Sequence, residues 1–224
     1  GTLLPMDLDT YIKDYFGRLA IHFAQHGYEP SRLIKEIRRG ISAMVTNDGS
    51  KTNEEAFWEY FRSAYGEKVI LDMPIFDNFY ETEYDKVKSV CGYTPASAEI
   101  LRMLQEKDLR IVLATNPLFP ACATYRRIKW AGLSPEDFEI YTTYENSRFS
   151  KPNLKYYQAI MDDLGVKADE CVMVGNDVGE DMIAAGLGMK VFLLTDCLIN
   201  TVGADINQYP HGDFEALRSF LAAL

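Results

Sequence analysis

Apolar residues recur every three or four positions through the first ninety residues of the chain. This spacing is typical of amphipathic helices that bury one face. Thr52 and Glu55 form a capping box at the start of the third helix, and turn residues separate the helices. No alternating strand pattern interrupts them. Helices are therefore predicted over about 8–26, 30–45, 52–65 and 74–87.

The pattern changes after Gly92, where short apolar runs rich in β-branched residues begin to alternate with helical stretches. Such runs are typical of buried strands, and strands that alternate with helices favour right-handed crossovers and a parallel sheet. Lys151-Pro152 is expected to open the helix that runs to Leu164. The predicted fold is α/β: a doubly wound parallel Rossmann-like sheet that follows a four-helix unit over about 8–90. The predicted strands are 109–114, 138–142, 171–174 and 190–194.

The composition narrows the range of partners. A formal net charge of −10 argues against nucleic-acid binding, which needs a basic surface. No apolar run approaches the roughly 18 residues that span a bilayer, so no membrane partner is expected. The four cysteines are widely spaced and form no CxxC pair. They are interpreted as reduced, which favours a cytoplasmic location.

Polar residues follow three of the predicted strands. Thr115 and Asn116 follow the first, Lys151 follows the second, and Asp177 and Asp181 follow the third. The carboxyl ends of parallel strands share one edge of a sheet, so these groups are expected to converge. A hydroxyl, a cation and two carboxylates that could hold Mg2+ make a phosphate-handling set. Each residue also has a structural interpretation: a strand-ending threonine, a solvated lysine, or acids that favour a helix N-terminus.

Taken in their order along the chain, these motifs resemble those of the haloacid dehalogenase (HAD) superfamily. Ala114-Thr115-Asn116 is similar to its phosphate-binding second motif, Lys151-Pro152 to its third, and Gly175-Asn176-Asp177…Asp181 to its acidic metal motif. The helical unit looks like the cap that the superfamily places between its first and second motifs, so the resemblance implies an α/β core of residues 1–7 and 91–224 with a helical cap domain over 8–90. The resemblance implies a Mg2+-dependent hydrolase that acts on a small phosphorylated metabolite, a phosphate monoester, through an aspartyl-phosphate. It implies that Thr115 and Lys151 are catalytic, that Asn116 binds substrate, and that Asn176, Asp177 and Asp181 hold the metal.

The first motif of the superfamily, Asp-x-Asp-Gly-Thr-Leu-Leu, is matched only at its tail, by Gly1-Thr2-Leu3-Leu4. The resemblance therefore places the nucleophilic aspartate just upstream of Gly1 and gives Thr2 a part in substrate binding. Asp7 and Asp9 form another Asp-x-Asp pair, but no core strand leads into it. We interpret it as the start of the first cap helix.

Two alternatives remain open at this stage. One is a 2-haloacid dehalogenase-type carbon–halogen hydrolase, whose chemistry needs no metal, so the acidic turn at 176–181 argues against it. The other is a non-catalytic phosphate-binding protein, which is expected if the chain truly starts at Gly1. Turnover of a phosphate ester distinguishes the second alternative from an enzyme.

Overall fold

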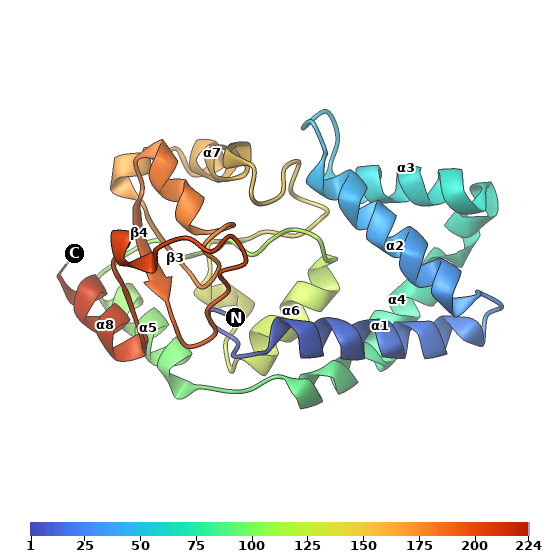
Figure 1. Ribbon diagram of the computed structural model, residues 1–224, viewed down its shortest axis with the longest axis horizontal. Helices are drawn as coiled ribbons and strands as arrows, with labels where there is room; N and C mark the ends of the chain where they lie inside the picture. Colours follow the sequence, from blue (N-terminus) through green and yellow to red (C-terminus); the bar gives the residue numbers. More distant parts are fainter. Residues whose placement is uncertain (224) are drawn as a thin grey trace.

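The computed structural model describes residues 1–223 and divides into a helical cap and an α/β core, which lie side by side (Figure 1). The cap contains four α-helices and two 3-10 helices. In chain order these are α1 (Leu8–Ala24), α2 (Pro30–Val45), α3 (Asn53–Tyr65), η1 (Glu67–Asp72), α4 (Met73–Thr82) and η2 (Tyr84–Val90).

Local sequence explains most of the helix boundaries in the cap. The Asp7 side chain caps α1 by accepting from Thr10 N, and the predicted capping box of Thr52 and Glu55 is confirmed at α3. The helix predicted over 74–87 is wrong in its second half, because α4 ends at Thr82 and a 3-10 helix follows. In that segment Tyr84 and Val87 are both fully buried. A 3-10 helix aligns side chains three apart, so it turns both toward the interior.

The chain passes between core and cap at two points that lie side by side. Met6 and Cys91 form an isolated antiparallel bridge, and Gly92 N donates to Pro5 O over 2.7 Å. The first connection leads into α1, and the second returns from η2 to α5 (Pro95–Glu106). The helical segment is therefore joined to the core by two adjacent connections.

The core contains two parallel sheets rather than the single sheet that the sequence predicts. β1 (Val112–Leu113) pairs with β2 (Ile140–Tyr141), while β4 (Lys190–Leu194) pairs with β3 (Val172–Gly175) on one side and β5 (His211–Gly212) on the other. Within residues 1–223 no strand joins β1 to β3. The remaining α-helices of the core are α6 (Ala121–Trp130), α7 (Leu154–Leu164) and α8 (Phe214–Ala222). Its 3-10 helices are η3 (Pro135–Asp137), η4 (Ala168–Glu170), η5 (Met182–Leu187) and η6 (Ile206–Gln208).

The predicted strands are found in the structure, but some of them differ in length from the prediction. The strand predicted over 190–194 is found with those bounds, whereas the one expected over 109–114 is reduced to two residues. The strand expected over 138–142 is likewise only two residues long. β1 and β2 pair only with each other, so a short register of two residue pairs defines both. β5 was not predicted, since His211-Gly212 carries no strand pattern.

The cap and part of the core share one hydrophobic cluster. Phe79 and Tyr84 from the cap belong to the same cluster of buried side chains as Ile128 and Trp130 of α6. Tyr84 and Trp130 bring their ring centroids to 5.0 Å. Full burial of a side chain of this size stabilises the fold by about 1.5–3 kcal/mol. This shared packing holds the cap against α6.

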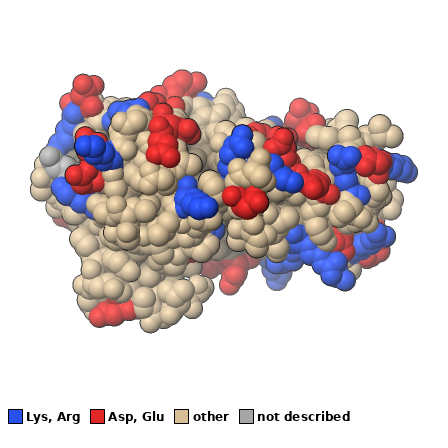
Figure 2. Space-filling view, turned by 90° about the horizontal axis from the view of Figure 1, so that it is seen from above, with Lys and Arg blue, Asp and Glu red and all other residues tan. Residues whose placement is uncertain are grey.

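The surface carries charges of both signs. On the face drawn in Figure 2, Lys and Arg side chains are interspersed with Asp and Glu side chains and form no continuous basic stripe. None of the helices within residues 1–223 combines the length and the apolar character needed to cross a membrane.

Candidate functional site

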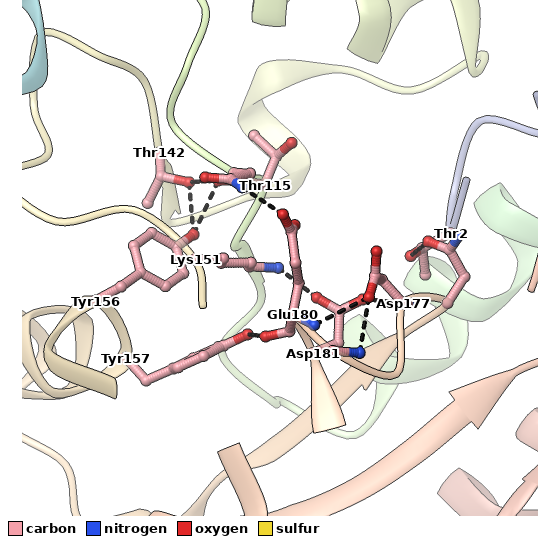
Figure 3. Close-up of polar contacts among 12 residues, drawn as sticks. Thr2, Thr115, Thr142, Lys151, Tyr156, Tyr157, Asp177, Glu180 and Asp181 are labelled. Carbon is pink, nitrogen blue, oxygen red and sulfur yellow. Dashed lines mark hydrogen bonds and ion pairs between the residues drawn. The ribbon is translucent and has the colours of Figure 1, made fainter. Parts of the chain in front are cut away.

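The polar residues predicted to converge come together beyond the carboxyl ends of β1 and β3 (Figure 3). Thr115 comes from the loop after β1, Lys151 from the loop that precedes α7, and Asp177 and Asp181 from the turn after β3. Lys151 and Asp181 are in direct contact. The structure therefore brings four of the predicted residues to one edge of the core.

The turn after β3 is shaped around the Asp181 carboxylate. Asp181 N donates to Asp177 O over 2.8 Å, which closes one helical turn, and Asp177 N donates back to Asp181 Oδ2 over 3.0 Å. A Cβ on Gly175 would lie 2.1 Å from that same Oδ2. Because this approach leaves no room for a side chain, glycine at the end of β3 is what permits the carboxylate to fold back under the turn.

Lys151 and Asp181 form a buried ion pair. Lys151 Nζ lies 2.5 Å from Asp181 Oδ1, and the two side chains are only 5% and 6% exposed. The Tyr156 and Tyr157 rings flank the ammonium group, with both centroids 5.7 Å from Nζ. The cation is thus held at a fixed point by one charge-assisted bond and two aromatic rings.

The prediction that Lys151-Pro152 opens a helix is wrong. α7 begins at Leu154, and the Asn153 side chain caps it by accepting from Lys155 N. Asparagine is a preferred N-cap residue, so the helix starts after it rather than at the proline. Lys151 therefore lies in the loop that precedes α7, where its side chain reaches the carboxyl edge of the core.

The backbone at Thr115 is fixed by two buried hydroxyl groups. Thr142 Oγ1 donates to Thr115 O over 2.6 Å, and the Tyr156 hydroxyl donates to the same oxygen over 2.9 Å. Burial raises the pKa of the Tyr156 hydroxyl well above its usual value, so this hydroxyl stays a donor. The carbonyl is occupied in this way, while the Thr115 hydroxyl is only half-buried and is available to a ligand.

Asp177 and Asn176 are positioned differently. Asp177 Oδ1 accepts from Gly179 N and Glu180 N at 2.8 and 3.0 Å, which fixes the carboxylate and leaves Oδ2 outside these bonds. Asn176 is tied on both sides: its Oδ1 accepts from the Thr2 hydroxyl, and its Nδ2 donates to Cys197 O. Thr2 is therefore in contact with the acidic turn, through Asn176.

Glu180 is a member of the site that sequence reasoning missed. Its Oε1 accepts from Asn116 Nδ2 over 2.8 Å, and Tyr157 donates to its backbone oxygen. Burial raises the pKa of the Glu180 carboxyl. Asn116 Oδ1 is buried and makes no hydrogen bond within residues 1–223. The only sequence signal for Glu180 is its place between Asp177 and Asp181, and glutamate is common on exposed turns.

The donor set can be compared with the requirements of Mg2+. The chemistry fits a hard cation, since the candidate ligands are carboxylate and amide oxygens. Asp177 Oδ2 is the oxygen best placed to bind, because both Asp181 oxygens are engaged by Lys151 and by Asp177 N. Across residues 1–223 no three His, Cys, Asp or Glu side chains converge as a metal cage. Mg2+ is compatible with this, because it commonly binds one or two carboxylates together with water and phosphate.

Fold and site together define a capped α/β protein with a hydroxyl, a lysine and carboxylates beyond the ends of parallel strands. The sequence profile of the haloacid dehalogenase-like hydrolases matches residues 1–187. The chain belongs to the haloacid dehalogenase-like hydrolase family. No curated protein matches the chain in sequence.

Solved structures support the same fold. A HAD phosphatase from Thermococcus onnurineus is 16% identical with a TM-score of 0.58, over 99% of this chain and 94% of that one. A HAD family enzyme from Bacteroides thetaiotaomicron is 18% identical with a TM-score of 0.52, over 92% and 91%. A predicted phosphatase from Clostridium acetobutylicum is 15% identical with a TM-score of 0.52, over 96% and 93%. At these identities the likeness concerns the fold.

Proposed function

We propose that this hydrolase cleaves small phosphate monoesters and depends on Mg2+. The observation that carries the proposal is the buried Lys151 ammonium, fixed at the carboxyl edge of the core beside the acidic turn. A buried cation on the same edge of the core as the Thr115 hydroxyl suits an anionic group with several oxygen acceptors. A phosphoryl group has that chemistry, and phosphatases are among the proteins that share the fold.

Each residue has a role that follows from its surroundings. Thr115 donates a hydrogen bond from its hydroxyl to a phosphoryl oxygen, since its carbonyl is already occupied by Thr142 and Tyr156. Lys151 stabilises negative charge on the same group, and Asp181 positions the lysine. Asn116 helps to bind the substrate beside Thr115, and Thr2 orients Asn176. These groups bind and orient the phosphoryl group that is transferred.

Asp177 is the principal metal ligand in this proposal, with Asn176 and Asp181 next to it. Its carboxylate is already oriented by two backbone N–H groups, so little reorganisation is needed to bind a cation. When bound, Mg2+ supplies positive charge that offsets the charge of the phosphoryl group. Lys151 carries one positive charge against three carboxyl groups of the turn, those of Asp177, Glu180 and Asp181, which leaves the site short of cations for a dianionic ligand.

The covalent step of the proposal needs an aspartate nucleophile, which we place N-terminal to Gly1. Asp7 does not fill that role: it is exposed and its carboxylate caps α1, and Asp9 is exposed on the first turn of that helix. A strand that lies between β1 and β3 would join the two sheets and end beside Thr115 and Asp177. The nucleophile attacks phosphorus and the ester P–O bond breaks as the alcohol takes a proton from the second aspartate of the same upstream motif; water, deprotonated by that aspartate, then cleaves the aspartyl-phosphate and releases inorganic phosphate.

The proposed substrate is a small metabolite rather than a polymer. The net charge of −10 disfavours nucleic acids, and the cap packs against the core next to the site. The four cysteines are all free thiols, which suits a reducing, cytoplasmic compartment.

Product analysis on the full-length protein tests the proposal. Phosphate release from p-nitrophenyl phosphate and chloride release from 2-chloropropionate are measured with Mg2+ and with EDTA. We expect phosphate release that requires Mg2+, and no chloride release. Chloride release that persists in EDTA would instead assign carbon–halogen hydrolysis, and phosphate binding without release of either product would assign a non-catalytic protein.

A further inference from the structure

Asn53, the first residue of α3, is fully buried where the cap meets the core. Its side-chain Nδ2 donates to Pro117 O over 3.2 Å and to Ser150 Oγ over 3.0 Å. Its Oδ1 accepts from Asn47 Nδ2 over 3.0 Å. One amide thus uses both its donors toward the core and its acceptor toward the cap.

Backbone N–H groups at the start of α3 also join the cap to the core. Asn53 N donates to Ser147 O and Glu54 N donates to Tyr144 O, each over 2.8 Å. The first N–H groups of a helix have no partner inside the helix. Here carbonyl groups of a core loop satisfy them, so the core loop takes part in capping a cap helix.

The turn before α3 packs on that same core loop. A Cβ on Gly49 would lie 2.2 Å from the Phe149 ring, and Gly49 has a φ of +92°. Glycine is needed there for both reasons, because a side chain would meet the ring and a positive φ disfavours other residues. The turn between α2 and α3 is therefore fitted to the loop at 144–150.

The two core atoms that Asn53 contacts stand next to the phosphate-handling residues in sequence. Pro117 follows Thr115 and Asn116 directly, and Ser150 immediately precedes Lys151. Ser150 is only 1% exposed, so its hydroxyl has little access to water as a substitute for the amide. Asn53 therefore bridges the loops that carry the hydroxyl and the cation of the site.

We infer that Asn53 is a positioning residue that couples the cap to the phosphate site. When the α2–α3 turn is docked, Asn53 fixes the spacing between the Thr115 loop and the Lys151 loop. When the turn is displaced, both loops lose a buried partner at once. The inference rests on the proposed phosphohydrolase function and adds to it a reason why the cap's position controls the reaction.

Three substitutions separate this role from ordinary structural support. Asn53→Asp keeps the shape and the bond from Asn47 but loses both donations to the core. Ser150→Ala removes the acceptor next to Lys151 together with the bond that the Ser150 hydroxyl donates to Met44 O. Thr52→Ala is the matched control, since it removes the neighbouring cap bond to Glu55 N within α3 and leaves every bond between Asn53 and the core in place.

The experiment uses the full-length chain and compares kcat and KM for p-nitrophenyl phosphate, inhibition by inorganic phosphate and the thermal midpoint. Misplacement of reacting groups by about 1 Å costs on the order of 100-fold in rate. We expect Asn53→Asp to lower kcat/KM by about 10- to 100-fold, with weaker phosphate inhibition, and Ser150→Ala to act in the same direction. Thr52→Ala should lower the thermal midpoint but leave kcat and phosphate inhibition within about twofold of the wild type.

The inference is overturned if Asn53→Asp keeps its kcat and phosphate inhibition, or if Thr52→Ala loses activity to the same extent as Asn53→Asp. Absence of phosphate-ester turnover in the wild type would refute the proposed function instead. In that case calorimetric titration with inorganic phosphate still decides the point: weaker binding by Asn53→Asp than by Thr52→Ala supports the coupling, and equal binding refutes it.

Discussion

The Lys151–Asp181 pair should couple strongly in stability. Both side chains are about 95% buried, and 2.5 Å separates Nζ from Oδ1. Removal of one partner leaves the other charge buried without compensation, which typically costs about 3–5 kcal/mol. Asp181 keeps its bond from Asp177 N, so Lys151→Met should fall near the lower end of that range, about 3 kcal/mol. The double variant with Asp181→Asn should cost less than the sum of the single variants by about 2 kcal/mol or more.

Urea unfolding in EDTA measures these free energies without a contribution from bound metal. The matched control is the Arg110–Glu139 pair, whose contact is similar in length at 2.6 Å but whose side chains are 46% and 43% exposed. Its double-mutant cycle, Arg110→Met with Glu139→Gln, should give a coupling of only about 0–1 kcal/mol. Equal coupling energies for the buried and the exposed pair would refute the reasoning.

Three further substitutions probe other parts of the molecule. Gly175→Ala places a Cβ 2.1 Å from Asp181 Oδ2. It should therefore destabilise the protein by about 1–3 kcal/mol and slow phosphate-ester turnover. Wild-type stability and wild-type turnover in this variant would contradict the tight approach. Thr52→Ala removes one half of the capping box and should cost about 1 kcal/mol, or roughly 2–4 °C in the thermal midpoint, measured by calorimetry. The Tyr60 hydroxyl and then Arg39 lower the pKa of Glu36 below 4.5, so Glu36 stabilises the fold above that pH and loses this contribution as pH falls through its lowered pKa. Urea unfolding should therefore show a penalty for Glu36→Gln at pH 7 that shrinks in acid, and a penalty that grows in acid would refute the assignment.

Local signals predicted the elements that depend on local chemistry. The β4 run at 190–194 is continuously apolar after its first residue, and the capping box fixes the start of α3. β5 could not be predicted, because its two residues become a strand only by pairing with β4. The 3-10 segment after α4 is set by burial of Tyr84 and Val87 rather than by helix propensity.

In the site, too, the residues that follow local sequence patterns could be predicted, and the contacts between distant residues could not. Thr115, Lys151 and Asp177 follow strand-like runs, so the rule that parallel strands end on one edge was enough to group them. The contact between Glu180 and Asn116 and the role of Asn53 could not be predicted, because each joins residues at least 64 positions apart. Such contacts depend on the packed arrangement of loops, for which a single sequence holds no periodic signal.

The measurement that tests the central claim most directly is the rate of phosphate release from p-nitrophenyl phosphate as Mg2+ is titrated into metal-free, full-length protein. The wild type should gain activity and saturate, and Asp177→Asn should lose it at every Mg2+ concentration while it keeps its fold by circular dichroism. An unchanged rate in EDTA, or a variant as active as the wild type, would contradict the assignment of the acidic turn to a metal-dependent phosphatase.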